Sequence, residues 1–61
     1  MNYQKIKLNL SEAGRRVDAG DLHAADLIIR SMVGKGMTRA DMDANLTKEQ
    51  MRKLRAHAKK N

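Results

Sequence analysis

The stretch that decides the fold is Asp18-Ala19-Gly20-Asp21, which separates two segments that both have helical periodicity. Gly20 can take the left-handed backbone conformation that commonly ends a helix, because it has no Cβ atom to clash. Asp21 then offers its carboxylate as the amino-terminal cap of the next helix. The stretch therefore predicts a tight turn that joins two neighbouring helices.

Before this turn, apolar residues recur at the spacing of one helical face. They are Tyr3, Ile6, Leu10, Ala13 and Val17. Residues 5–10 also alternate between polar and apolar, as in a strand, but a single strand without a partner is not stable. We therefore predict a helix that includes this whole stripe from Tyr3 onward. Asn9 and Glu12 have the spacing of a capping box, so a start at Asn9 is the alternative.

After the turn, a second helix is predicted over residues 22–33, and its apolar arc is broad. This arc includes Leu22, Leu27, Ile28, Ile29 and Val33. A chain of 61 residues does not readily cover so much apolar surface, because it buries only about 60% of the surface that it exposes when unfolded. We therefore predict these five residues as an apolar interface. A homo-oligomer, in the form of a two-fold dimer, is the simplest way to bury it.

Two further helices are predicted from a repeated start signal. Thr38 is an amino-terminal cap, and Asp41 completes its capping box. Thr47 and Gln50 repeat this arrangement nine residues later. The hydrophobic-staple positions around the two caps are held by Met37, Met42, Leu46 and Met51. The third helix is predicted to be short, over residues 39–45, because the next cap follows at once.

The fourth helix is predicted from residue 48 toward residue 58, with Met51, Leu54 and Ala58 facing inward at helical spacing. The chain is thus expected to be a single small all-α domain over residues 1–61. Its expected architecture is a bundle of three to four short helices, in which a helical hairpin is completed by a capped carboxyl-terminal helix.

The composition excludes several ways of stabilising or anchoring so short a chain. It has no Cys, and Tyr3 is its one aromatic residue, so neither a disulfide nor a Cys-rich metal site is available. No apolar run approaches the roughly 18 residues of a membrane span. Residues 1–10 also lack the apolar stretch of a signal peptide. We therefore expect a cytoplasmic protein that does not bind a membrane.

Positive charge is concentrated at the carboxyl end. The net charge is +6, from 13 Lys and Arg against 7 Asp and Glu. Residues 1–46 hold seven bases and six acids, whereas residues 47–61 hold six bases and the single acid Glu49. Such a segment attracts polyanions or acidic protein surfaces. The predicted contacts to an anionic partner are Arg52, Lys53, Arg55, Lys59 and Lys60. The alternative is that these bases complement the helix dipole and keep the protein soluble.

No group of residues indicates catalysis or a metal site. The chain lacks a Cys nucleophile, and His23 and His57 are 34 positions apart in the sequence. Asp21 is better explained as a helix cap than as a metal ligand, and Asp26 lies about one helical turn from His23 on a polar face. We therefore predict a protein that is not an enzyme and that has no cofactor or metal ion.

The spacing of Met32, Gly36 and Met42 resembles that of a DNA-binding helix-turn-helix. The helix that would enter the groove carries Asp41 and Asp43, however, and carboxylates oppose the contacts to phosphates that dominate DNA binding. We do not expect this helix to read DNA. The basic carboxyl-terminal helix is the alternative contact to nucleic acid, although no aromatic residue neighbours it to stack on bases.

The run Leu10-Ser11-Glu12-Ala13-Gly14-Arg15-Arg16-Val17-Asp18-Ala19-Gly20-Asp21 resembles small early-region proteins of lambda-like temperate bacteriophages. The resemblance implies a non-enzymatic accessory protein that regulates phage development inside the bacterial cell, and it assigns no functional residue. We therefore expect a regulatory or adaptor protein that contacts a host or phage protein. The alternative is a DNA- or RNA-binding regulator that uses its basic carboxyl-terminal helix.

Overall fold

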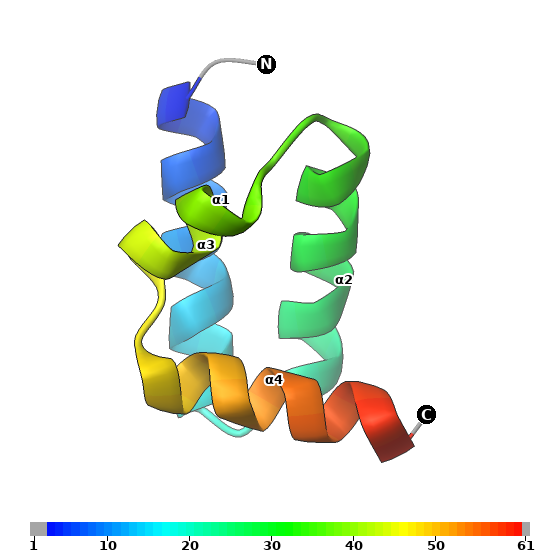
Figure 1. Ribbon diagram of the computed structural model, residues 1–61. Coiled ribbons are helices and arrows are strands. Elements are labelled where there is room, and N and C mark those ends of the chain that lie inside the picture. The colour runs from blue at the N-terminus through cyan, green and yellow to red at the C-terminus, as the bar shows by residue number, and fades with distance from the viewer. Residues whose placement is uncertain (1–2, 61) are drawn as a thin grey trace.

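The described part of the chain folds into a bundle of four helices. The computed structural model describes residues 3–60, with the backbone alone at Lys60. The helices are α1 (Tyr3–Asp18), α2 (Leu22–Gly34), α3 (Arg39–Asn45) and α4 (Lys48–Lys60), and no strand occurs within these residues. The helices α1 and α2 lie side by side, α3 packs on α1, and α4 crosses the hairpin near its turn (Figure 1). The predicted small all-α bundle is confirmed.

The turn between α1 and α2 has the predicted geometry. Gly20 has a φ of 84°, which lies in the left-handed region that favours glycine. Its amide donates to Val17 O at 2.9 Å, and the amide of Asp21 donates to Arg16 O at 2.8 Å. These two hydrogen bonds form a Schellman motif, which satisfies the last carbonyls of α1. The carboxylate of Asp21 then accepts from the amide of Ala24 at 3.3 Å and caps α2.

The helix α1 begins at Tyr3, so the alternative start at Asn9 is wrong. The side-chain amide of Asn9 donates to Lys5 O at 2.8 Å, four residues back along the same helix. Glu12 accepts hydrogen bonds from Arg15 and Arg16 and takes no part in a capping box. The predicted apolar face is buried except at its first residue, Tyr3, which is 52% exposed.

The core holds nine buried apolar side chains among the described residues. They are Ile6, Leu10, Ala13, Val17, Ala25, Met32, Met37, Leu46 and Leu54. Ala13 of α1 and Ala25 of α2 have no exposed surface, and small residues at these positions let two helices approach closely. No residue of α3 itself is fully buried, so the partly buried Met42 and the flanking Met37 and Leu46 hold this helix to the core.

Both predicted capping boxes are present. At α3, the amide of Asp41 donates to Thr38 Oγ1 at 3.2 Å, and the amide of Thr38 donates to the Asp41 carboxylate at 3.0 Å. At α4, the amide of Gln50 donates to Thr47 Oγ1 at 3.0 Å, and the amide of Thr47 donates to Gln50 Oε1 at 2.9 Å. Each box satisfies two backbone amides that lack a partner within the helix.

Gln50 also ties α4 to α1, which the sequence did not predict. Its Nε2 donates to Gly14 O and to both carboxylate oxygens of Asp18, each at 3.2 Å. A Cβ atom at position 14 would lie 3.1 Å from Gln50 Nε2, so a side chain there would displace the amide. Gly14 thus permits the close approach of α4 to the last turns of α1.

One prediction for α4 is wrong. Leu54 is buried and Met51 packs partly against the core, as predicted, but Ala58 is exposed. The helix crosses the hairpin, and its last turns extend beyond α2 (Figure 1). Ala58 belongs to the last turn of α4 and is therefore exposed.

The first prediction concerns the stability that Gln50 provides. We expect Gln50→Ala to lower the free energy of unfolding by about 2 kcal/mol, because it removes half of a capping box and the link to α1. Urea denaturation followed by circular dichroism measures this change. The control is Lys53→Ala on the exposed side of the same helix, which should change stability by less than about 0.5 kcal/mol.

A double-mutant cycle with Gly14→Ala completes this test. Alanine favours a helix by about 1 kcal/mol over glycine, but in the wild-type protein its methyl group displaces the Gln50 amide. Gly14→Ala should therefore stabilise the Gln50→Ala protein and fail to stabilise the wild type. Equal effects of Gly14→Ala in the two backgrounds would show that the contact contributes nothing to stability.

Candidate functional site

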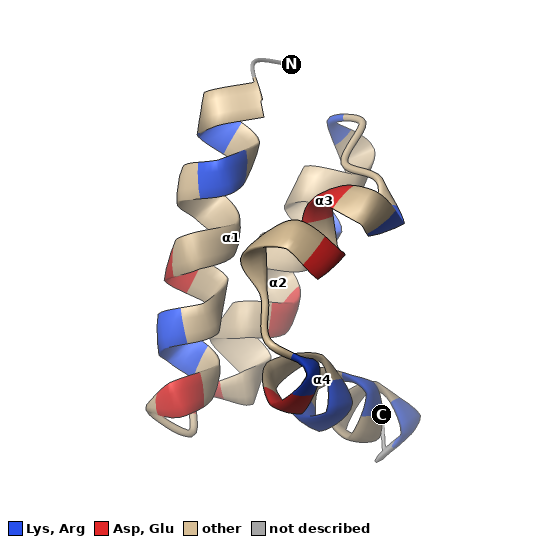
Figure 2. Cartoon of the chain, turned by 60° about the vertical axis from the view of Figure 1, so that its left-hand side comes forward, with Lys and Arg blue, Asp and Glu red and all other residues tan. Residues whose placement is uncertain are grey.

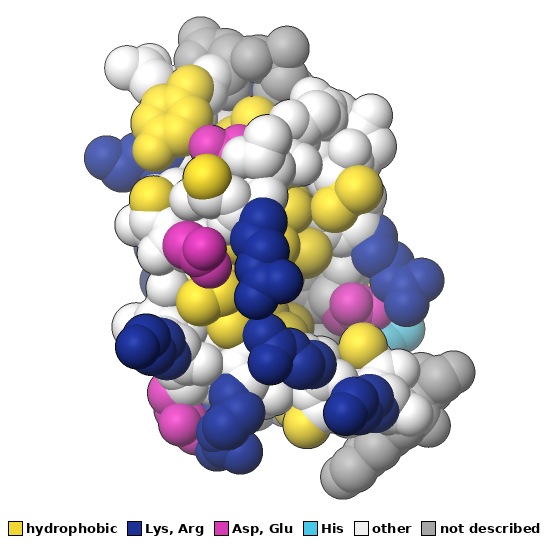
Figure 3. All heavy atoms as spheres, in the orientation of Figure 1, with side chains coloured by type: hydrophobic (Ala, Val, Ile, Leu, Met, Phe, Trp, Pro, Cys, Tyr) yellow, Lys and Arg dark blue, Asp and Glu magenta, His cyan; other side chains and the backbone are white. Residues whose placement is uncertain are grey.

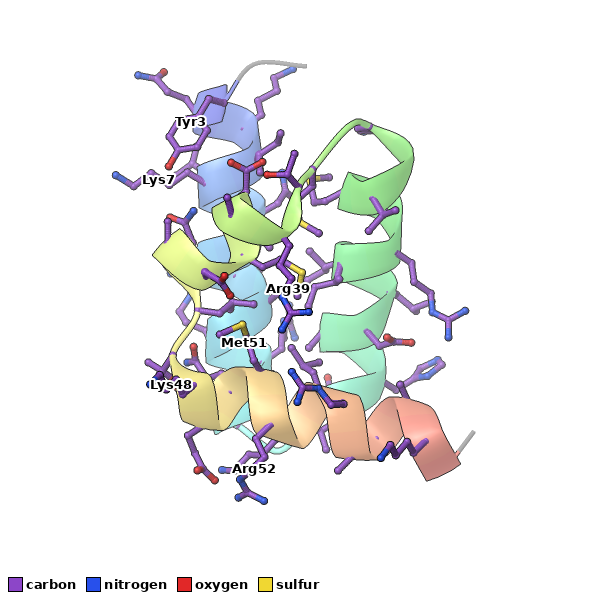
Figure 4. The ribbon with its side chains drawn as sticks, in the orientation of Figure 1. Tyr3, Lys7, Arg39, Lys48, Met51 and Arg52 are labelled. Atoms are coloured by element: carbon purple, nitrogen blue, oxygen red, sulfur yellow. The ribbon has the colours of Figure 1, made fainter. Side chains whose placement is uncertain are left out.

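Four cationic side chains of α4 form a straight row, which we call the basic row. It consists of Lys48, Arg52, Arg55 and Lys59. Their spacing of four, three and four residues places them on one side of a helix with 3.6 residues per turn, over a length of about 16 Å. All four are exposed, and Figure 4 shows Lys48 and Arg52 pointing outward from α4.

The row agrees only in part with the predicted anionic-partner contacts. Arg52, Arg55 and Lys59 belong to it, but Lys53 points to another side of α4, since it follows Arg52 by a single residue. The side chain of Lys60 lies outside the described residues. Lys48 joins the row and was not among the predicted contacts, although its helical spacing from Arg52 and Arg55 was visible in the sequence.

Three of the four cations of the row have no acid partner among the described side chains. Elsewhere, Arg15 and Arg16 pair with Glu12, and Arg30 pairs with Asp26 at 2.9 Å. The members of the row without an ion pair among residues 3–59 are Lys48, Arg55 and Lys59. Positive charge therefore accumulates along α4 at these three residues.

The fourth member, Arg52, is held by Glu49. Its guanidinium donates to both carboxylate oxygens of Glu49, one turn earlier on α4. This hydrogen bonding lowers the pKa of Glu49, and the charges of Arg52 and Lys53 add a smaller effect in the same direction. Glu49 thus stays ionised at neutral pH and neutralises part of the charge at this end of the row.

Arg39 of α3 extends the positive surface beyond α4. It is exposed and has no ion pair within the described part of the chain. Its side chain reaches from α3 toward α4 (Figure 4), and Lys and Arg side chains form a nearly continuous band from α3 to α4 on this side of the molecule (Figure 3). We call the basic row together with Arg39 the basic face.

Acidic groups of α3 limit the basic face on one side. Figure 2 shows the acidic segments of α3 above the mostly basic α4. Asp41 is engaged in its capping box, and Asp43 is exposed one turn after Arg39. An anion that contacts the basic face is therefore favoured along α4 and disfavoured over the rest of α3.

The predicted apolar interface on α2 is not brought together as one surface. Leu22, Ile28 and Ile29 pack against the core and are partly buried. Leu27 and Val33 are 54% and 57% exposed, but their separation of six residues places them about 120° apart around the helix. The bundle thus covers more of this arc than expected, and the homo-oligomer stays a prediction.

The structure does bring the two histidines to one groove. The groove has a volume of about 260 Å³ and lies between α2 and α4, lined by His23, Asp26, Leu27, Arg30 and His57. Asp26 is already paired with Arg30, and residues 3–59 contain no cluster of three groups that could hold a metal ion. His57 faces almost opposite to the basic row on α4, so the groove and the basic face are separate sites.

Comparisons with protein-family models, with curated proteins and with solved structures find no match to this chain. The resemblance of residues 10–21 to phage early-region proteins stays a prediction. Among the described residues, no helix combines the length and the apolar character that crossing a membrane requires.

The second prediction concerns the ionisation of Glu49. We expect Arg52→Gln to raise the pKa of Glu49 toward the ordinary glutamate value of 4.5, because it removes the main hydrogen bond to the carboxylate. Folding lowers the pKa of Glu49, so its ionised carboxylate stabilises the folded protein. This stabilisation is fully present above the pKa of Glu49 in the unfolded chain and is lost as the pH falls through its pKa in the folded protein. A carboxyl ¹³C NMR titration measures the change. The control is Arg55→Gln, and an equal shift in that protein would contradict the specific pairing.

Proposed function

We propose that the protein is a non-enzymatic regulatory or adaptor protein that binds an anionic macromolecule through its basic face. The observation that carries the proposal is the accumulation of cations without acid partners along one side of α4, next to Arg39 of α3. The protein would then act by binding its partner, and no side chain would take part in a chemical reaction.

The spacing of the cations favours this function over a merely solvated surface. Neighbours in the basic row are three or four residues apart, which is about 4.5–6 Å along the helix. This is less than the Debye length of about 8 Å at physiological salt. The electrostatic potentials of the cations therefore add, and the cations repel one another. An anionic partner would relieve that repulsion and gain from all members of the row together.

The helix dipole does not account for the row. Cations near a helix carboxyl end are stabilised by the dipole, and this applies to Lys59. Lys48, however, is the first residue of α4, where the dipole disfavours positive charge, and Arg52 lies in the second turn. The placement of Lys48 in line with the other three therefore supports a role in binding.

The biological setting rests on the resemblance of residues 10–21. It supports an accessory protein that regulates phage development in the cytoplasm of a bacterial host. The partner is then an acidic host or phage protein, or alternatively a nucleic acid. Self-association through the exposed Leu27 or Val33 of α2 is a separate part of the proposal.

The third prediction tests the basic row against an equal loss of charge elsewhere. We expect Lys48→Gln/Arg55→Gln/Lys59→Gln to weaken binding to a fluorescent heparin fragment, a generic polyanion, by at least about tenfold. The triple variant leaves the Arg52–Glu49 pair intact. Fluorescence anisotropy at low salt measures the affinity.

The matched control is Lys5→Gln/Lys35→Gln/Lys53→Gln. These three lysines are exposed, have no ion pair within the described chain and lie outside the basic face. The control removes the same net charge, so a general effect of charge would weaken both variants equally. Equal weakening, or no binding by the wild type, would refute the proposed function.

The fourth prediction concerns the acid within this helix. Glu49→Gln should strengthen heparin binding by about two- to fivefold, because it releases Arg52 and removes a negative charge beside the row. Glu12→Gln changes the net charge by the same amount and releases Arg15 and Arg16 on α1, away from the basic face. Glu12→Gln should therefore increase the affinity for heparin less than Glu49→Gln does. An equal increase would show that the binding surface is not the basic face.

A further inference from the structure

We infer that the basic face binds the phosphate backbone of double-stranded nucleic acid without reading its sequence, and that Arg39 is part of this site. The inference rests on the proposed function and names its partner. It depends on the tertiary arrangement, because α3 and α4 bring Arg39 to the same side as the basic row (Figures 3 and 4).

The first step is the match in charge density. The basic row covers about 16 Å of helix with four cations. A DNA double helix carries one negative charge per about 1.7 Å of its axis, so the same length offers roughly nine phosphates. Over this length the phosphates of a duplex, counted on both strands, outnumber the cations of the row, whereas ordinary protein surfaces mix both signs of charge and seldom offer such a row of acids.

The second step is the lack of apolar anchors on the basic face. Protein interfaces gain most of their affinity from a few aromatic or aliphatic side chains that are buried on binding. The large exposed apolar side chains of the described chain are Tyr3, Leu8, Leu27 and Val33. All four lie on α1 and α2, so α3 and α4 offer cations with little apolar surface. This favours a phosphate backbone over an acidic protein.

The third step distinguishes a double helix from a single strand. Proteins that bind single strands usually stack the bases on aromatic side chains. Tyr3 is the one aromatic residue of the chain, and it lies near the start of α1, far from α4 (Figure 4). Without stacking, the affinity must come from phosphates, which a double helix presents at the higher density.

The fourth step concerns sequence preference. Bases are read in the major groove by side chains of an inserted helix or ribbon. The short α3 carries Asp41 and Asp43 close to Arg39, and these carboxylates oppose insertion among phosphates. The basic row itself consists of Lys and Arg on the outside of one helix, an arrangement suited to contacts with backbone phosphates, which carry no sequence information.

The test is the salt dependence of binding, measured by fluorescence anisotropy. The probes are two DNA duplexes of unrelated sequence, an RNA duplex, a single-stranded DNA and polyglutamate, which stands for an acidic protein. With five phosphates contacted, the logarithm of the DNA association constant should fall with a slope of about −4.5 against the logarithm of salt concentration. This is a loss of roughly 500-fold between 50 and 200 mM salt.

Arg39→Gln tests whether the site includes α3. It should reduce the salt slope by about one and weaken duplex binding about eightfold at 0.1 M salt, equally for both sequences. Lys35→Gln is the matched control, because Lys35 is exposed, has no ion pair among residues 3–59 and precedes α3 at the far end of the bundle from α4. It should leave the slope unchanged. An unchanged slope in Arg39→Gln would exclude Arg39 from the site.

The other probes separate failure of this inference from failure of the proposed function. Tighter binding of polyglutamate or of the single strand than of either duplex would overturn the inference and leave an anion-binding protein. A strong preference for one DNA sequence would overturn binding to the backbone alone. The DNA and RNA duplexes show which double helix is preferred, and binding to none of the probes would overturn both proposals.

Discussion

The arrangement of the bundle depends on one side-chain amide, that of Gln50. Its oxygen completes the capping box that starts α4, and its nitrogen binds the carbonyl of Gly14 and the carboxylate of Asp18 on α1. The same residue therefore fixes where α4 begins and where it lies on the hairpin. Because a hydrogen bond is directional, and because a Cβ atom at position 14 would lie 3.1 Å from Gln50 Nε2, these contacts add to the burial of Leu54 in defining the position of α4.

The position of α4 in turn determines which charges face solvent together. Leu54 faces the core, so the helical spacing puts the basic row on the outside of the bundle. The short α3 has no fully buried residue of its own and is held by Met37, Leu46 and the partly buried Met42. This attachment carries Arg39 to the side of the molecule that α4 already makes positive (Figure 4). Several acids that could compensate these charges are engaged elsewhere, Asp21 and Asp41 in caps and Glu12 and Asp26 in ion pairs.

The apolar arc of α2 is covered within the bundle to a greater extent than the sequence suggested. The broad arc of α2 is shared between neighbours, because α1 packs along α2 and α4 crosses it. Leu22, Ile28 and Ile29 are partly buried in this way, and Leu27 and Val33 stay exposed on separate sides. A second consequence of the crossing is the groove that unites His23 and His57. Nothing in their separation along the chain indicated that they would meet.

The sequence by itself determined the helices, their ends and the excess of charge on α4, because caps, turns and periodicity act between residues a few positions apart. The two capping boxes, the Gly20 turn and the buried face of α1 were all predicted for this reason. Only the tertiary structure decided the link from Gln50 to Gly14, the exposure of Ala58, the division of the α2 arc and the addition of Arg39 to the basic row. These features depend on the angle at which α4 crosses the hairpin, and that angle is set by packing and hydrogen bonds between residues more than 30 positions apart, which no local pattern encodes.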